Sequence, residues 1–497
     1  MRSYKNNSNY RSSNKEVVKV VSSNLSTNID FVKNALFNTS DLMIRNIEKN
    51  NLKVAVLYID TIVKSDVIET QLQQIINSPN EGIINTLSNK DIKLSTSLDE
   101  SILALVKGKT IIFTENETTA VFLNTSSFEN RTVDEPHNEQ VVRGSHDGFV
   151  ESLEININLV RRRINNPNLV VNYLTLGRES DTTIALVYVV SIANEELVKE
   201  VKRRLSYIDV DYVVNIEEFI EDNSFSPFPQ MLSTERPDRV AANLMDGRVA
   251  VVTDGTPSVL VMPITFFSFY QTPDDYNSRW IIASFFRLMR LLSFIISISL
   301  PALYIALVSF HFEIIPIDLV FNVKSSLEYV PFPPLIEALS MQIILELLRE
   351  SAIRLPSPIS QTLGVVGGLV IGTAVVEANL VSNTMLVVVA LTAISSFVVP
   401  DSEMGTSVRI LGFPLMFAAS FIGLIGIVFG LVLILIHLCK LESFGSPYFA
   451  PFAPFRSKDM KDTIYRLPMW KMSERPRSPL PKKFRKTKNS RGWKNNE

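Results

Sequence analysis

Three long apolar runs in the C-terminal half constrain the fold of this chain more than any other feature. They are residues 288–310, 363–400 and 410–439. A helix needs about 20 mostly apolar residues to cross a hydrocarbon core of about 30 Å. The second run is long enough for two shorter spans, hinged near residues 377–384. We therefore predict four membrane spans in a helical transmembrane domain over residues 285–440.

A fifth helical pattern, residues 335–353, carries charged side chains among its apolar positions: Glu337, Glu346, Arg349 and Glu350. Inserting an ionised Asp, Lys or Arg into hydrocarbon costs about 2.5–3.5 kcal/mol, and we assume a similar cost for Glu. A fifth span would also place the basic flanks, Arg287/Arg290 and the C-terminal tail, on opposite sides. We therefore interpret this segment as an interfacial, re-entrant or bundle-buried helix.

The first 280 residues contain charges throughout and no apolar run of spanning length. We predict an α/β N-terminal half with two α/β subdomains, 26–140 and 145–275, after a disordered arm, 1–25. Alternation and helical periodicity indicate the elements within each subdomain. The strands are expected at 53–60, within 110–124 (two strands), at 183–192, and within 248–262, a hairpin around Asp254-Gly255; the helices are expected at 66–77, 149–164 and 197–208.

The C-terminal end has a different charge from the rest of the chain. Residues 456–497 hold 14 Lys/Arg and 4 Asp/Glu, whereas the whole chain has a net charge of −2. We predict a basic, disordered cytoplasmic tail over 441–497 that can contact anionic lipid headgroups. No nucleic-acid partner is predicted, because the tail lacks a recognisable binding module. The N-terminus lacks the apolar core of a secretory signal, so both termini are expected in the cytoplasm.

Gly364, Gly368 and Gly372 recur every four residues and would form a stripe of small residues on one helix face. Such a stripe lets membrane helices approach closely, either inside one bundle or between subunits. Glu377 and Asn379 follow it. They either reach the hydrated membrane interface or line a polar path for ions.

Gln342, Glu346 and Glu350 also recur every four residues and form a polar, mostly acidic row on the 335–353 helix. The row is either the solvated face of an interfacial helix or part of an ion path. An acidic lining favours cations over anions. The pore and gating candidates are therefore Gln342, Glu346, Glu350, Gly364, Gly368, Gly372, Glu377 and Asn379.

Catalytic, metal and cofactor motifs are missing from the sequence. The four histidines are scattered without ligand spacing, and no P-loop, dinucleotide fingerprint or G-x-S-x-G is present. We expect no enzyme activity and no cofactor, and the ligand-binding residues cannot be named. The run Arg161-Arg162-Arg163 has two interpretations, a solvated helix face or a site of domain docking or lipid contact.

Several segments together resemble the GerABKA family, the A subunits of spore germinant receptors. They are TERPDRVAANLMDGRVAVVTDGTPSVLVMP (234–263), YQTPDDYNSRW (270–280), LPALYIALVSFHFEIIP (300–316), ELLRESAIRLP (346–356) and GVVGGLVIGTAVVEANLVS (364–382). The similarity runs from about residue 145 to 455. The chain departs from the family at Phe312, where a Pro is usual, and at Thr373, where a Gln is usual.

The resemblance implies a multi-pass protein of the inner spore membrane that acts with a permease-like B subunit and a lipoprotein C subunit. Such receptors sense small nutrients and trigger germination, and the nutrient is expected to act through a partner. The A subunits are thought to form a homo-oligomeric, ligand-gated cation channel. The alternative from the membrane segments alone is a secondary transporter for the nutrient, which no inverted repeat of interrupted helices supports.

Overall fold

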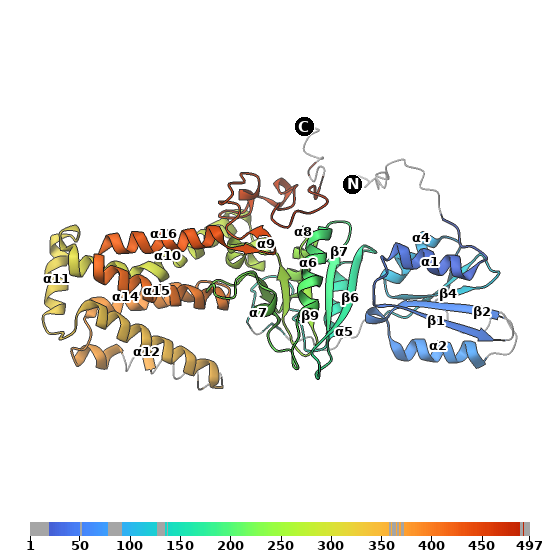
Figure 1. Cartoon of the computed structure of the whole chain (residues 1–497), viewed down its shortest axis with the longest axis horizontal. Helices are drawn as coiled ribbons and strands as arrows, with labels where there is room; N and C mark the ends of the chain where they lie inside the picture. The colour runs from blue at the N-terminus through green and yellow to red at the C-terminus, as the bar shows by residue number, and fades with distance from the viewer. Residues whose placement is uncertain are drawn as a thin grey trace, which may run out of the picture.

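A computed structural model shows an elongated molecule with three bodies in a row: a helical bundle, a central α/β unit and a terminal α/β unit (Figure 1). It describes residues 19–49, 52–77, 92–126, 135–136, 138–356, 359, 364, 367–368, 372–487 and 491. Residues 1–18, most of the predicted arm, lie outside this set. The rest of that arm is folded, because the Val21 amide donates to the Thr96 carbonyl at 2.8 Å. The first α/β unit therefore begins near residue 19 instead of 26.

The first unit is a sheet covered by helices on both faces. Its elements are α1 (Leu25–Ala35), β1 (Leu42–Lys49), β2 (Leu52–Ile59), α2 (Ser65–Asn77), β3 (Lys93–Ser95), α4 (Leu98–Val106), β4 (Lys109–Thr114) and β5 (Ala120–Asn124). Alternate residues of β2 explain the two covered faces. Ala55 and Leu57 pack with α1 and α4, whereas Val54 and Val56 pack with Ile68 of α2.

The second unit repeats this architecture. Its elements are α5 (Leu153–Arg163), β6 (Leu169–Leu176), β7 (Thr182–Val189), α6 (Glu195–Ser206), α7 (Ile216–Ile220), β8 (Leu232–Thr234), α8 (Pro237–Asp246), β9 (Val249–Thr253) and β10 (Val259–Met262). Among the described residues the sheet orders are β1-β2-β4-β5-β3 and β6-β7-β9-β10-β8, all antiparallel. The two units therefore share one strand order without an evident sequence repeat.

A buried ion pair joins the two units. Arg161 of α5 donates to both carboxylate oxygens of Asp41, at 2.5 and 2.7 Å, and both side chains are almost fully buried. The Ser40 amide donates to the Val171 carbonyl at 2.8 Å beside it. Of the two interpretations of the arginine run, domain docking therefore holds for Arg161, and the solvated face is wrong there.

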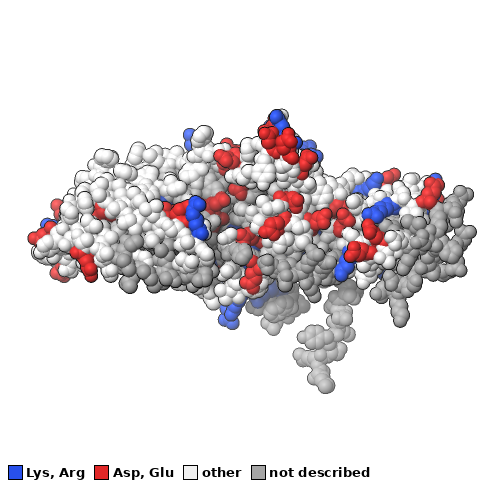
Figure 2. All heavy atoms as spheres, turned by 90° about the horizontal axis from the view of Figure 1, so that it is seen from below, with Lys and Arg blue, Asp and Glu red and all other residues white. Residues whose placement is uncertain are grey.

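The C-terminal half is a helical bundle. Its elements are α9 (Pro273–Asn277), α10 (Trp280–Phe310), α11 (Ile317–Leu327), α12 (Pro334–Arg354), α14 (Asn383–Phe397), α15 (Ser402–Ile422) and α16 (Leu424–Lys440). On the face that Figure 2 shows, much of the bundle is uncharged, while Lys, Arg, Asp and Glu gather over the α/β units and at the two ends of the bundle. Apolar side chains such as Phe285, Ile295 and Leu433 are half exposed on this surface. Such an apolar belt on a folded chain indicates contact with lipid or other apolar partners.

The predicted count of four spans is not confirmed. Among the described residues, α10 and α15 are the two helices long and apolar enough to cross a membrane, and α14 and α16 are apolar but shorter. The single long span expected over 410–439 is wrong, because the chain turns back at Gly423. This residue has φ +63° and ψ −139°, a conformation that glycine alone adopts readily, and the turn separates α15 from α16. The expected hinge near 377–384 is confirmed by the break before α14.

The predicted disordered tail is also wrong for residues 441–487, which pack on the second α/β unit (Figure 1). Tyr448 is fully buried against Phe266 and Phe269. Arg475 donates to the carbonyls of Met245, Lys483 and Arg485 at 2.6–2.9 Å. The basic composition of this segment predicted disorder. Arg475 instead binds backbone carbonyls, and local sequence patterns do not reveal such partners.

Candidate functional site

A buried carboxyl group joins three helices at the end of the bundle that lies away from the α/β units. Glu337 of α12 is fully buried, and its Oε2 accepts the Ser382 amide at 3.2 Å and the Ser382 hydroxyl at 3.0 Å. Ser382 also caps α14, and its hydroxyl lies 3.1 Å from Tyr304 Oη of α10. Glu337 Oε1 is buried without a hydrogen-bond partner in the described part of the chain. In the sequence, Glu337 was noted only as one of the charges that make a membrane span over residues 335–353 unfavourable.

The predicted polar row on α12 lies partly between helices. Gln342 is buried, and its Oε1 has no partner among the described residues. Glu346 pairs with Arg409 of α15 at 3.2 Å and with Arg349 at 3.4 Å. Glu350 pairs with the exposed Arg354 at 2.5 Å. The row is therefore less acidic than its sequence suggests, because an arginine accompanies each of its carboxylates.

The α12 helix is packed within the bundle instead of lying apart from it. Its start contacts Ser382, before α14, through Glu337, and its end contacts Ser396, near the end of α14, through Arg349 at 3.1 Å. The two helices therefore run in the same direction. Of the predicted placements for 335–353, the bundle-buried one fits these contacts.

The glycine stripe has unequal surroundings. A Cβ at Gly364 or Gly368 would meet no described atom within 4 Å, whereas Gly372 is buried beside Leu386. Glu377 and Asn379 are both exposed. Asn379 has φ +52°, and the Leu380 amide donates back to the Val375 carbonyl, so Asn379 closes the helix end in a left-handed cap. The structure thus does not bring Glu377 and Asn379 together with the α12 row.

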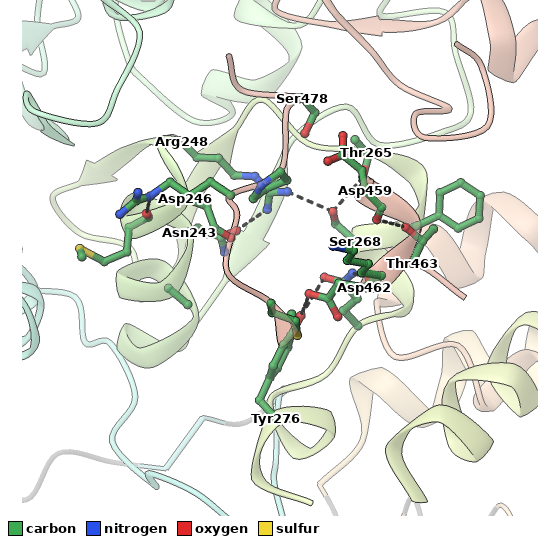
Figure 3. A pocket seen from close by; sticks show the side chains of 18 of the residues that line it. Asn243, Asp246, Arg248, Thr265, Ser268, Tyr276, Asp459, Asp462, Thr463 and Ser478 are labelled. Carbon is green, nitrogen blue, oxygen red and sulfur yellow. Dashed lines mark hydrogen bonds between the residues drawn. The ribbon is translucent and has the colours of Figure 1, made fainter. Parts of the chain in front are cut away.

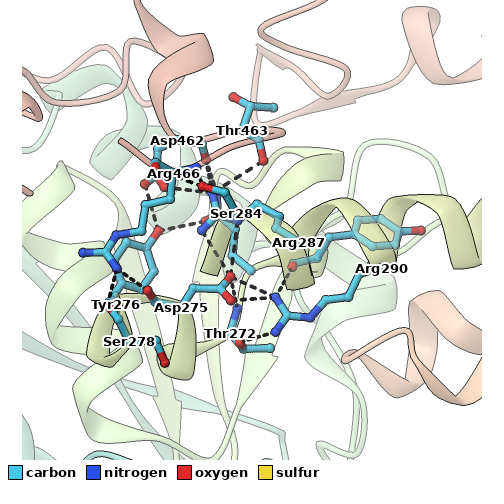
Figure 4. A network of polar contacts seen from close by, with 12 residues as sticks. Thr272, Asp275, Tyr276, Ser278, Ser284, Arg287, Arg290, Asp462, Thr463 and Arg466 are labelled. Carbon is cyan, nitrogen blue, oxygen red and sulfur yellow. Dashed lines mark hydrogen bonds and ion pairs between the residues drawn. The ribbon is translucent and has the colours of Figure 1, made fainter. Parts of the chain in front are cut away.

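A dense ion-pair network joins α9, the start of α10 and the folded C-terminal segment (Figure 4). Asp275 of α9 is buried and accepts from Arg290 at 2.8 Å and from Arg287 at 3.2 Å. Arg287 is also buried and donates to Asp462 of the C-terminal segment at 2.8 Å. These arginines, predicted to be a basic flank of the membrane, bind carboxylates instead. The sequence does contain a signal for this pairing, because the two arginines are three residues apart at the start of an apolar helix and follow the carboxylates Asp274-Asp275.

The same network contains two groups with displaced pKa values. Burial raises the pKa of Asp462, although the Arg287 guanidinium acts in the opposite direction. Burial also raises the pKa of Tyr276, whose hydroxyl donates to Asp462 at 2.8 Å. Arg466 donates to the Asp275 carbonyl, so the C-terminal segment contacts both α9 and α10. Movement of this segment therefore changes the surroundings of the first turns of α10.

A second contact lies at the start of α15. Ser407 donates to the Pro227 carbonyl, and Ser226 Oγ lies 2.9 Å from His437 Nε2 of α16. Nearby, burial raises the pKa of Glu217 to about 8, with further contributions from the carboxylates of Glu403, Glu221 and Asp401. The second α/β unit therefore contacts both helices of the last hairpin, α15 and α16.

The described residues contain no group of three or more His, Cys, Asp or Glu placed to hold a metal ion. The arrangement is instead a tandem α/β head and a bundle with an apolar surface and polar groups between its helices, and the C-terminal segment forms ion pairs with both. These features define the class as a membrane-associated protein with a large folded head. The chain belongs to the GerA spore germination protein family, whose model, described as "Bacillus/Clostridium GerA spore germination protein", matches residues 30–478.

The chain is also similar to individual proteins. The chain is 40% identical to spore germination protein KA of Bacillus subtilis (strain 168), covering 93% of this chain and 88% of that protein. It is 39% identical to the uncharacterized membrane protein YfkQ of the same organism, covering 92% and 91%. A crystal structure of the N-terminal domain of the A subunit of the Bacillus megaterium spore germinant receptor GerK3 is 30% identical, covering 50% of this chain and 98% of that chain, with a TM-score of 0.40.

Proposed function

We propose that this chain is the A subunit of a nutrient germinant receptor in the inner spore membrane, with its helical half forming part of an oligomeric, ligand-gated cation channel. Membership of the germination family and a relative named as a membrane protein support the receptor role. The partners are a permease-like B subunit and a lipoprotein C subunit, and the nutrient reaches the channel through a partner. The termini lie on the cytoplasmic side.

The observation that carries the channel is the polar character of α12 inside an apolar bundle. Glu337 and Gln342 each keep a buried oxygen without a described partner, and Glu346 pairs with a neighbouring helix. Burying ionisable groups at membrane depth is unfavourable, so such groups mark ion paths or gates. A nutrient opens such a gate only if the assembly binds it more tightly in the open state.

The glycines support assembly from several copies. Gly364 and Gly368 are exposed, and no described atom would contact a side chain added to either. A close helix seam at these positions would be made with atoms outside the described part of this chain, and a second chain can supply them. We propose that this seam packs against a neighbouring A subunit and that Glu377 lies near it.

The test is nutrient-triggered potassium release from spores that carry Glu346→Ala or Glu377→Ala at matched protein level. Loss or slowing of release is expected for Glu346→Ala, because Arg409 would lose its carboxylate partner. Glu196→Ala, an exposed substitution on α6, is the control. Unchanged release in both bundle variants removes these residues from the ion path.

A secondary transporter for the nutrient, the alternative that the apolar helices leave open, is the second candidate. Uptake of labelled nutrient into vesicles that contain the assembled receptor separates the two functions. Accumulation of nutrient without an ionic current supports the transporter, and a nutrient-gated current without accumulation supports the channel.

A further inference from the structure

A cavity of about 590 Å³ lies between the second α/β unit and the folded C-terminal segment. Its walls come from α8 and the 3-10 turn Phe266–Tyr270 on one side and from residues 458–478 on the other (Figure 3). These segments are about 200 residues apart in the chain, so sequence patterns do not reveal the cavity. Its volume is in the range of sites for small organic ligands.

Arg248, at the start of β9, points toward the middle of this cavity (Figure 3). The residue is 7% exposed. Its Nη1 donates to Asn243 Oδ1 and its Nη2 lies 3.4 Å from Ser268 Oγ, while its Nε is buried without a partner in the described part of the chain. Arg248 forms no ion pair with any described carboxylate. Burial lowers its pKa, but a guanidinium remains charged in proteins.

The partly buried charges around Arg248 have their own partners. Asp246 pairs with Lys486 at 2.5 Å, and Asp462 pairs with Arg287 at 2.8 Å. Arg239 pairs with Glu139. These carboxylates are therefore already neutralised, and the positive charge of Arg248 is left without a counter-ion. A buried charge is unfavourable unless it is paired, so the cavity is suited to an anion.

We propose that this cavity binds a small organic anion, whose carboxylate or phosphate group pairs with Arg248 and accepts a hydrogen bond from Ser268. A guanidinium binds both groups through two parallel N–H donors. Leu232, Phe267 and Met472 also line the cavity and offer an apolar surface for the body of the ligand. The cavity is larger than a single inorganic ion requires, and this favours an organic anion.

The site lies beside the junction between head and bundle, and this inference does not depend on the proposed channel. Asp462 lines the cavity and also pairs with Arg287 near the start of α10. A bound anion would contact both walls and stabilise the docked C-terminal segment. Ligand binding to the folded chain therefore raises its free energy of unfolding, by an amount that grows with the logarithm of the ligand concentration above Kd.

The experiment is a thermal-unfolding titration of the full-length protein in detergent with three anions: succinate, glycerol 3-phosphate and inorganic phosphate. Glycerol tests whether the uncharged part of glycerol 3-phosphate stabilises the protein without the phosphate group. Potassium chloride at equal ionic strength tests general salt effects. A rise in the midpoint with succinate or glycerol 3-phosphate that exceeds the potassium chloride control and grows with the logarithm of concentration supports the proposal and shows which anionic group is preferred. A rise with inorganic phosphate alone, equal shifts with glycerol, or no rise beyond the potassium chloride control overturns it.

Two variants localise the binding. Arg248→Gln keeps a hydrogen-bonding group and is expected to weaken the apparent affinity about ten- to hundredfold, the usual cost of losing hydrogen bonds to a charged group. Ser268→Ala keeps the charge of Arg248 and is expected to weaken the apparent affinity severalfold. This variant tests the site if Arg248→Gln fails to fold. Arg178→Gln, at an exposed pair with Asp209, is the matched control. Wild-type affinity in a folded Arg248→Gln protein overturns the proposed site.

Discussion

The ion pair between Arg161 and Asp41 is the clearest point at which to test how the two α/β units are held together. Replacing Arg161 with Met keeps most of the side-chain volume and removes the charge. Asp41, which is 2% exposed, would then keep its carboxylate without the guanidinium that binds both of its oxygens. The Thr39 and Thr61 hydroxyls remain as donors to Asp41 but carry no charge.

The expected cost follows from this burial. Breaking a buried pair by removing one partner costs about 3–5 kcal/mol, because the other charge stays in a poorly solvating site. At 1.36 kcal/mol per tenfold change, this corresponds to roughly a hundred- to several-thousandfold increase in the population of the opened interface. Arg163→Met, two residues along α5, removes a partly exposed pair with Asp147 and should cost at most about 1 kcal/mol.

Hydrogen exchange of the full-length protein, followed by mass spectrometry, measures this opening. The reporter is the Ser40 amide, which donates to the Val171 carbonyl across the interface. We expect much faster exchange there in Arg161→Met than in Arg163→Met. The double variant Arg161→Met/Asp41→Asn should exchange more slowly than Arg161→Met, because no unpaired charge remains.

Two results would refute this reasoning. If Arg161→Met and Arg163→Met change the exchange at Ser40 equally, burial does not strengthen the pair. If the double variant opens more than either single variant, the cost comes from lost packing and not from a charge left alone.

Three further predictions use other parts of the molecule. The pKa of Glu217 is raised to about 8 in the folded chain, so this carboxyl group keeps a proton that the unfolded chain releases above about pH 4.5. The thermal stability should therefore fall as the pH rises from about 5.5 to 8.5. Glu217→Gln should flatten this dependence. A pH profile with the same slope in both proteins would contradict the assignment. Gly423→Ala should destabilise the chain by about 1–3 kcal/mol, because φ is positive and a Cβ would lie 2.7 Å from His311, whereas Gly405→Ala within α15 should be neutral in the same unfolding assay. Asp462→Asn should speed proteolysis within residues 441–487, because Arg287 loses a buried carboxylate, and an unchanged cleavage rate would show that the segment is held by other contacts.

Local patterns were sufficient for part of the strands and helices of the α/β half, whereas elements such as α1, β1, β6 and α8 were not predicted. The apolar run at β2, the hairpin at Asp254-Gly255 and the spacing in α5 each predict an element that the structure contains. The motifs quoted in the sequence likewise led to the germination family. These features depend on residues close together in the chain, so the sequence displays them directly.

Several of the contacts on which the proposals rest could not be predicted in this way. Arg161 and Asp41, Arg287 and Asp462, and Glu337 and Ser382 are between 45 and 175 residues apart. A charge run cannot show which of its members is buried, and a basic tail looks disordered when its partners are backbone carbonyls.

By itself, the sequence determined that this chain has an α/β head, a set of apolar helices and a place in the germination family, because periodicity and composition are local properties. The tertiary structure alone decided which charges are paired, where the last apolar run turns back at Gly423, and that Arg248 faces a cavity without a counter-ion. Burial and pairing depend on distances between remote segments, and these exist only after the chain has folded.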